Sequence, residues 1–129
     1  MEVPVEKIVE KIVYKDPEPQ PRESIRRDIF FLIRGSEVSK TEMKKVEDIV
    51  AYLNKYPEAK VSITGYADKG TGNPKINEGY AKKRAQKVAD LLVEKYGIAK
   101  SRITVDSKGD TVQPYDINNL NRVSICIAE

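Results

Sequence analysis

The fold is decided by residues 64–85, which read TGYADKGTGNPKINEGYAKKRA. The residues that lead into this stretch, Lys60–Gly65, alternate polar and apolar side chains as a half-buried β-strand does. Glycines and a proline then punctuate residues 70–74, which predicts a loop. Apolar residues return at helical spacing from Ala81 onward, so the stretch predicts a strand, a loop and a long helix in that order.

Two side chains of opposite charge mark this stretch as a candidate binding site. Asp68 follows the strand end, and Arg84 lies early enough on the helix to turn toward the loop. The planar guanidinium can hold a carboxylate through two parallel hydrogen bonds, which a lysine cannot do. Backbone amides between Gly70 and Asn77 can add donors, and Gly72 lets the backbone approach a ligand closely. We therefore expect a site for a zwitterion.

Each candidate also has a purely structural explanation. Asp68 could close a turn through its own backbone, and Arg84 could form an exposed ion pair with Glu78 or Asp90 at little net energy. Spacing alone favours these structural explanations over ligand binding. Arg122 could line the same cleft, or it could be an exposed arginine at the end of a strand.

The start of the second helix is open to two interpretations. Asn77 is expected to be the helix N-cap first and a neighbour of the ligand second. Asn73 is a rival N-cap, because Pro74 would then occupy the first helical position, which proline favours.

Residues 1–24 differ from the rest of the chain. The sequence of Glu6–Val9 repeats at once as Glu10–Val13, in a pattern that fits either an extended chain or a helical stripe. Alternate prolines within Asp16–Pro21 favour a semi-rigid spacer. We therefore expect an extended or weakly structured linker over residues 1–24 and one folded domain over residues 25–129.

Apolar patterns outside the central stretch predict the first strand and the first helix. Asp28–Ile33 is apolar on both faces, which is typical of a strand inside a sheet. Ser39 and Glu42 have the spacing of a capping box at the start of a helix, and this helix should stop by Tyr56, before Pro57.

Two further strands complete the predicted fold. Gly97 and Ile98 are expected to close the second helix, and strands follow at Arg102–Ser107 and Arg122–Ile127, with a polar loop at residues 108–120 between them. The order is β-α-β-α-β-β, which predicts an α+β fold with two helices packed on one face of a four-stranded mixed sheet.

The central stretch resembles the OmpA-like C-terminal domain, the peptidoglycan-associating module of Gram-negative cell envelopes. That family's pattern is roughly G-[HY]-T-D, a glycine, and then N-x-x-L-S-x-x-R-A-x-x-V. Here the matching residues are Gly65-Tyr66-Ala67-Asp68, Gly72, Asn77, Tyr80-Ala81, Arg84-Ala85 and Val88. Further matches are Gly97-Ile98, Gly109, Pro114 and Asn121-Arg122-Val123, so the resemblance covers about residues 26–129. The chain departs from the pattern at Ala67, where the family has threonine, and at Tyr80-Ala81, where it has Leu-Ser.

The resemblance implies a non-covalent peptidoglycan-binding function. Asp68 would hold the ammonium of a diaminopimelate residue in the stem peptide and Arg84 its carboxylate, with Asn77, Gly72 and Arg122 beside the ligand. Such a domain faces the periplasm and anchors the outer membrane to the cell wall. Its link to the membrane would be an upstream anchor that this chain does not contain, and a homo-oligomer is left open.

Composition argues against several other classes. The sequence has no His, which is the commonest general base and metal ligand, and neither a nucleophile motif nor a metal cluster is evident, so we expect no enzyme activity, metal or cofactor. The net charge of +3 without a basic stripe argues against nucleic acid. Cys126 lies in a strand pattern and is expected to be a buried structural thiol. The loop lacks the Gly-Lys-[Ser/Thr] of a phosphate loop and the acids of a calcium loop.

Two rival functions and the cellular compartment stay open at this level. A protein–protein scaffold of the same fold could assemble through Glu6–Tyr14, and a hydrolase is the second rival. No apolar run is long enough to span a bilayer and no signal peptide opens the chain. From the residues alone this fits a cytoplasmic protein or a fragment of a larger precursor, while the resemblance implies the periplasmic side of the outer membrane.

Overall fold

The computed structural model describes residues 22–129. Most of the predicted linker, including the repeat in Glu6–Val13 and the assembly segment Glu6–Tyr14, lies outside the described residues. In chain order the described elements are β2 (Ile25–Phe30), α1 (Lys40–Lys55), β3 (Val61–Gly65), α2 (Pro74–Glu94), the 3-10 helix η2 (Lys100–Arg102), β4 (Ile103–Ser107), the 3-10 helix η3 (Asn118–Asn121) and β5 (Val123–Ala128). The predicted α+β order is confirmed.

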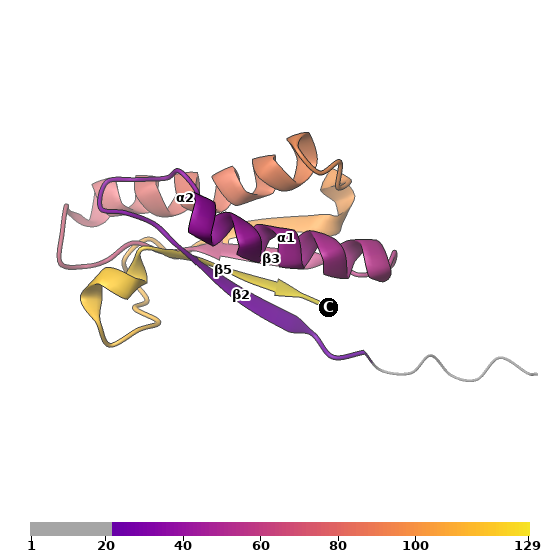
Figure 1. Cartoon of the computed structure of the whole chain (residues 1–129). Coiled ribbons are helices and arrows are strands. Elements are labelled where there is room, and N and C mark those ends of the chain that lie inside the picture. Colours follow the sequence, from indigo (N-terminus) through magenta and orange to yellow (C-terminus); the bar gives the residue numbers. More distant parts are fainter. Residues whose placement is uncertain (1–21) are drawn as a thin grey trace, which may run out of the picture.

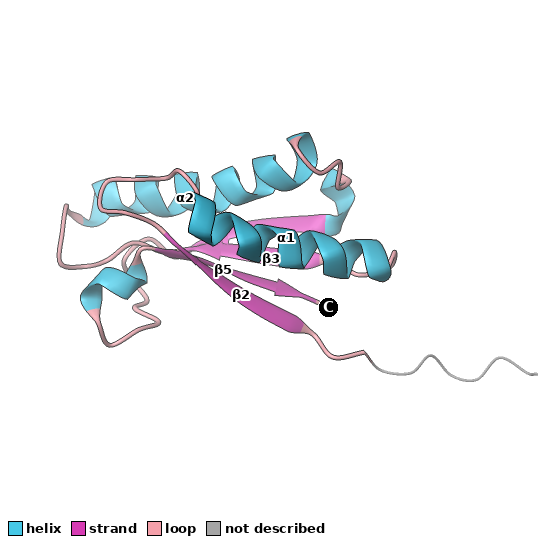
Figure 2. Cartoon of the chain, viewed as in Figure 1, coloured by secondary structure: helices cyan, strands magenta, loops and turns pink. Residues whose placement is uncertain are grey.

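The four strands form a mixed sheet in the order β2-β5-β3-β4. β5 runs antiparallel to both β2 and β3, whereas β3 and β4 are parallel because α2 connects them as a crossover. Both helices cover the same face of this sheet (Figure 1, Figure 2). The predicted two-layer arrangement is therefore confirmed.

The first strand differs from its prediction. β2 ends at Phe30 and, among the strands of residues 22–129, lies at the edge of the sheet and not inside it. Phe31 is buried in the core, but Leu32 and Ile33 are 77% and 47% exposed. The chain leaves the sheet here because a turn begins at Leu32, where the N–H of Gly35 donates to the Leu32 carbonyl at 2.9 Å. The apolar run therefore extends past the strand into an exposed turn.

The hydrophobic core lies between the sheet and the two helices. α1 contributes the buried side chains of Val46, Ile49, Val50 and Leu53. Cys126 of β5 is fully buried in the same core, and burial raises the pKa of its thiol to about 12. Because only the thiolate is reactive, this confirms a structural role for Cys126.

The cap of α1 is only partly as predicted. Ser39 is the N-cap, and its side chain accepts from the N–H of Glu42 at 3.4 Å. The carboxylate of Glu42 does not reach back to Ser39, and accepts instead from the N–H of Phe30 at 2.7 Å. This bond occupies the carboxylate and ties the start of α1 to the end of β2.

Both ends of α2 are fixed by local sequence. Asn73 is the N-cap, accepting from the N–H of Ile76 at 2.9 Å, and Pro74 begins the helix, so the prediction that Asn77 caps it is wrong. At the other end Gly97 has a φ of +71°, and Ile98 donates to the carbonyl of Leu92, as predicted.

Close packing places α2 directly on β3. A Cβ added to Gly65 would lie 2.0 Å from the Ala81 carbonyl oxygen, so no larger residue fits at this strand end. The strand end and the first half of α2 are therefore held together, and the loop between them has a fixed frame.

Candidate ligand-binding site

Three loops meet at one end of the molecule. They are residues 31–39 after β2, residues 66–73 after β3 and residues 108–122 before β5 (Figure 1, Figure 2). β2 and β3 end here and β5 begins here, because β5 is antiparallel to both. Groups far apart in the sequence are thus brought to a common place.

Asp68 and Arg84 line one hollow of about 280 Å³ at this end. Asp68 is 2% exposed and Arg84 is 1% exposed. No ion pair joins these two described side chains. The other residues that line the hollow are Arg34, Ala67, Thr71, Gly72, Ile76, Asn77 and Tyr80.

The carboxylate of Asp68 is held by its own loop and by the loop before β5. Its Oδ2 accepts from the Thr71 hydroxyl at 2.8 Å and from Asn118 Nδ2 at 3.0 Å, and its Oδ1 lies 3.7 Å from Arg122 Nη1. Burial acts to raise the pKa of Asp68, but these hydrogen bonds and the charge of Arg122 outweigh burial and leave the pKa below its ordinary value. The hollow therefore carries a fixed negative charge at neutral pH.

The guanidinium of Arg84 is fastened to two loops. Its Nε donates to the Gly35 carbonyl at 2.8 Å, its Nη1 to the Tyr66 carbonyl at 3.2 Å and its Nη2 to the Leu32 carbonyl at 3.3 Å. Burial lowers the pKa of Arg84 to about 10, so the group stays protonated at neutral pH. Of its five N–H donors, one on each terminal nitrogen is left over, which is the number a carboxylate needs for two parallel bonds.

The structure rejects the alternative in which Arg84 forms an exposed ion pair. Glu78 lies near Lys82 on the same helix at 3.6 Å, and Asp90 accepts from Gln86 at 2.8 Å. The Arg84 guanidinium instead lies 5.3 Å from the centre of the Tyr80 ring, an arrangement that stabilises a buried cation.

Asn77 holds the loop that carries Asp68. It is 3% exposed, and its Nδ2 donates to the Thr71 carbonyl at 2.8 Å, to Asp110 Oδ2 at 2.9 Å and to the Asp68 carbonyl at 3.3 Å. Gly72 has a φ of +67°, and a Cβ there would lie 2.5 Å from Asn77 Oδ1. Glycine is therefore required at 72 by both the backbone conformation and the contact.

Arg122 lies behind Asp68, outside the lining of the hollow. Its Nε donates to the Phe31 carbonyl at 3.2 Å and its Nη1 to Asn119 Oδ1 at 3.3 Å, and its side chain is 13% exposed. Its place is neither of the two alternatives expected from the sequence: it is a largely buried counter-charge to Asp68.

Sequence reasoning missed three residues of this site. Thr71 is three positions from Asp68 in the same loop and donates to its carboxylate, so this contact is local in the sequence. Asn118 is far away in the sequence, yet it also accepts from the N–H of Gly70 at 2.9 Å. Arg34 lies on the turn after β2, just beyond the strand predicted at Asp28–Ile33. Neither of these two carried a local signal.

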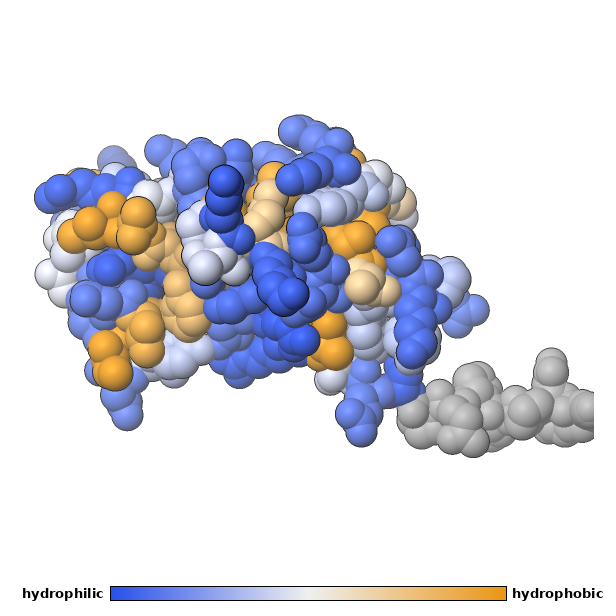
Figure 3. Space-filling model, in the orientation of Figure 1, coloured by the Kyte–Doolittle hydropathy of each residue, from blue (hydrophilic) through white to orange (hydrophobic). Residues whose placement is uncertain are grey.

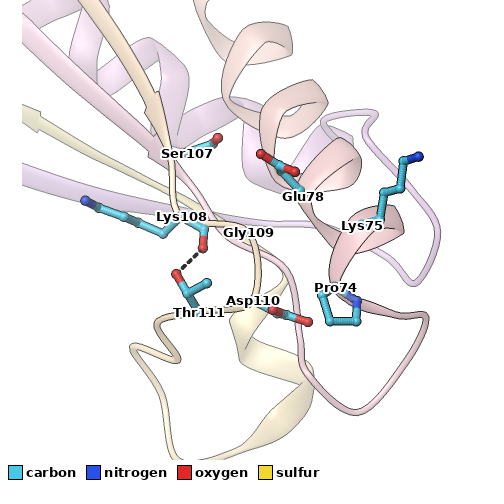
Figure 4. Close-up of a pocket in the computed structure, with 8 residues that line it drawn as sticks. All are labelled: Pro74, Lys75, Glu78, Ser107, Lys108, Gly109, Asp110 and Thr111. Atoms are coloured by element: carbon cyan, nitrogen blue, oxygen red, sulfur yellow. Dashed lines mark hydrogen bonds between the residues drawn. The ribbon is translucent and has the colours of Figure 1, made fainter.

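A second hollow, of about 420 Å³, lies beside the start of α2 (Figure 4). Its charged side chains do not converge, because Lys75 and Lys108 point in opposite directions and Glu78 forms an ion pair within α2. Asp110 is buried here, and its bond to Asn77 supports the loop of the first hollow. The first hollow is therefore the better candidate for a binding site.

Residues 22–129 hold no group of three His, Cys, Asp or Glu side chains placed to bind a metal ion. None of the helices described in this part of the chain combines the length and the apolar character needed to cross a bilayer.

The chain belongs to the OmpA family, whose model matches residues 30–124. Outer membrane protein 40 of Porphyromonas gingivalis is 34% identical over 116 residues, which are 87% of this chain and 30% of that protein. Outer membrane protein 41 of the same organism is also 34% identical, over 75% of this chain and 24% of its own length. The chain thus spans less than a third of these relatives.

Solved structures of low sequence identity share the fold. The peptidoglycan-associated lipoprotein from Burkholderia pseudomallei superposes with a TM-score of 0.73 at 19% identity, covering 80% of this chain and 90% of that structure. The C-terminal domain of Helicobacter pylori MotB gives a TM-score of 0.64 at 24% identity, covering 77% and 81%.

Proposed function

We propose that this domain binds peptidoglycan non-covalently through the free end of a diaminopimelate residue in the stem peptide. The observation that carries the proposal is the pair of buried, opposite charges, Asp68 and Arg84, which line one hollow without forming an ion pair with each other. Burying two charged groups is costly unless each has a partner. Asp68 already has Arg122 at 3.7 Å and Arg84 is held by three carbonyls, and a ligand with an ammonium and a carboxylate on one carbon would add an opposite charge beside each.

Asp68 and Arg84 each have hydrogen-bonding capacity left for one charged group of the ligand. Asp68 Oδ1 accepts no hydrogen bond from a described residue and lies 3.7 Å from Arg122, so it can accept from an ammonium. The two spare N–H groups of Arg84 can hold the carboxylate. Ile76 lines the hollow and is 50% exposed, so it offers apolar contact to the carbon chain behind the charged end.

This geometry predicts selection of the cell-wall type. A lysine-type stem peptide has the terminal ammonium but lacks the neighbouring carboxylate. Arg84 would then lose a charged partner, at about 1.5–3 kcal/mol for a hydrogen bond to a charged group. We therefore propose a preference for diaminopimelate-type over lysine-type wall.

The relatives support a proposal for the cellular role. They are outer membrane proteins, so we propose that the domain lies on the periplasmic side and anchors the outer membrane to the wall, with residues 1–24 as a linker. We propose binding without catalysis, since the sequence has no His, the commonest general base. Affinity at one site is expected to be modest, and many domains facing one polymer would hold by avidity.

Calorimetry with two matched peptides tests the proposal. One peptide ends in meso-diaminopimelate and the other in lysine, and both are titrated into the wild-type chain, Asp68→Asn and Arg84→Lys. We expect the wild type to bind the first peptide at least tenfold more tightly than the second, because losing a hydrogen bond to a charged group costs about 1.5 kcal/mol or more. Both variants should lose most of this affinity. Unchanged binding in either variant would remove that residue from the site.

Co-sedimentation with purified sacculi separates this role from a scaffold. The wild-type chain should pellet with diaminopimelate-type sacculi, and Asp68→Asn should stay in solution. A protein–protein scaffold would stay in solution in both forms, and a hydrolase would release soluble muropeptides. Circular dichroism of each variant shows whether its fold is retained.

A further inference from the structure

A second guanidinium lines the hollow from a strained turn. Arg34 is exposed, contributes to the lining, and has a φ of 55°, a left-handed conformation that few residues other than glycine adopt. Such strain persists only where the surrounding structure enforces it, and it concentrates at ligand-binding positions.

The side chain of Arg84 holds this turn in place. It donates to the carbonyls of Leu32 and Gly35, which are the two ends of the turn that contains Arg34. The same turn is closed by the bond from the Gly35 N–H to the Leu32 carbonyl. The residue that is proposed to hold the ligand carboxylate therefore also fixes where Arg34 is presented.

Positive charge exceeds negative charge around the hollow. Arg34 and Arg84 line it, and Arg122 lies 3.7 Å from Asp68, which is the one carboxylate in the lining. With the buried carboxylate of Asp110, which accepts from Asn77, three guanidinium groups face two carboxylates. Among the described residues no carboxylate pairs with Arg34, and Glu37, on the same loop, pairs with Lys87 at 3.3 Å. A zwitterionic end group is neutral and leaves this excess uncompensated.

We propose that Arg34 is a specificity-determining residue that gives the hollow a second anion-binding point. This inference rests on the proposed function. It specifies that the ligand has, besides the diaminopimelate end group, a further carboxylate nearby on the same peptide. In a stem peptide the groups of this kind are the α-carboxylate of the γ-linked glutamate and the second carboxylate of diaminopimelate when the peptide ends there. Arg34 discriminates acidic stem peptides from those in which these groups are amidated or extended.

The test compares two peptides with the same zwitterionic end. One is N-acetyl-L-alanyl-γ-D-glutamyl-meso-diaminopimelate, and the other has its two remaining carboxylates blocked as carboxamides. Both are titrated by calorimetry into the wild type, Arg34→Asn and Lys60→Asn. Asparagine tolerates the left-handed conformation, so Arg34→Asn keeps the turn. Lys60 is exposed just before β3, away from the loops that form the hollow, and its substitution removes the same charge.

We expect the wild type to bind the acidic peptide about fivefold more tightly than the blocked one, the upper range for an ion pair at an exposed position. Arg34→Asn should bind the two equally and match the wild type on the blocked peptide, while Lys60→Asn keeps the preference. A preference that survives in Arg34→Asn overturns the inference. Equal binding of both peptides by the wild type also overturns it and leaves the proposed function standing, whereas binding of neither overturns both.

Discussion

Arg84 combines a structural task with a proposed ligand-binding task. Its three bonds to the carbonyls of Leu32, Gly35 and Tyr66 join the loop after β2 to the loop after β3. A buried carbonyl that loses its donor costs about 1–3 kcal/mol. The arginine is therefore part of the frame of the hollow as well as of its surface.

Arg84→Lys is expected to lower the free energy of unfolding by about 2–4 kcal/mol, because one ammonium cannot serve three carbonyls spread over two loops. Urea denaturation followed by circular dichroism measures this. Lys82→Arg, on an exposed position of the same helix, is the matched control and should leave the midpoint unchanged. A wild-type midpoint for Arg84→Lys would contradict the structural role.

The lowered pKa of Asp68 predicts that the stability of the fold depends on pH. Its pKa is lowered in the folded protein, mainly because hydrogen bonds from Thr71 and Asn118 outweigh the effect of burial. A lowered carboxyl pKa contributes stability that is present above the unfolded pKa, about 3.9, and is lost as the pH falls through the folded pKa. The stability difference between wild type and Asp68→Asn should stay constant from neutral pH to about 4 and shrink below it. A difference that grows in acid would contradict this reading of the site.

At the scale of elements, the loop between β3 and α2 is held by contacts that leave no room at Gly72. Its φ of +67° and the 2.5 Å approach of Asn77 Oδ1 both exclude a side chain. Gly79 lies inside α2 with no atom within 4 Å of an added Cβ, and it is therefore a matched control.

Gly72→Ala should lower the free energy of unfolding by about 1–2 kcal/mol and weaken diaminopimelate binding, since both the backbone and Asn77 must shift. Gly79→Ala should raise stability by about 0.5–1 kcal/mol, because alanine is favoured in helix interiors. Thermal unfolding and calorimetry measure the two effects. Equal behaviour of the two variants would show that the loop is not held as described.

The sequence predicted those elements that are specified by residues close together in the chain. The spacing of apolar residues in α1, the proline after it, and Gly97 at the end of α2 each specify structure over a few residues. The end of β2 at Phe30 was not predictable in this way, because the turn at Leu32 is fastened by Arg84 from a distant helix. The edge position of β2 depends on its pairing with β5 at the other end of the sequence. The role of Asn77 was predicted wrongly for a similar reason: its partner Asp110 lies in another loop, so local sequence indicated only a helix cap.

In the whole molecule, the hollow and the start of β2 lie at opposite ends of the sheet. Ile25 pairs with Ala128 at the start of β2, and the three loops that form the hollow gather at the far end of the same sheet (Figure 1). Figure 3, in the same orientation, shows hydrophobic surface at that loop end, where Leu32, Ile33 and Ile117 are exposed. The proposed linker would join the domain at one end and leave the other end free for the proposed polymer ligand.

The central claim is that two buried, opposite charges grip one amino-acid end group, and an NMR titration of the wild-type chain with free meso-diaminopimelate tests it most directly. Amide shifts should concentrate in residues 32–35 and 66–73, the two loops joined by Arg84, and Asp68→Asn should abolish them. Shifts confined to the hollow between Pro74 and Thr111, or identical shifts in Asp68→Asn, would contradict the account.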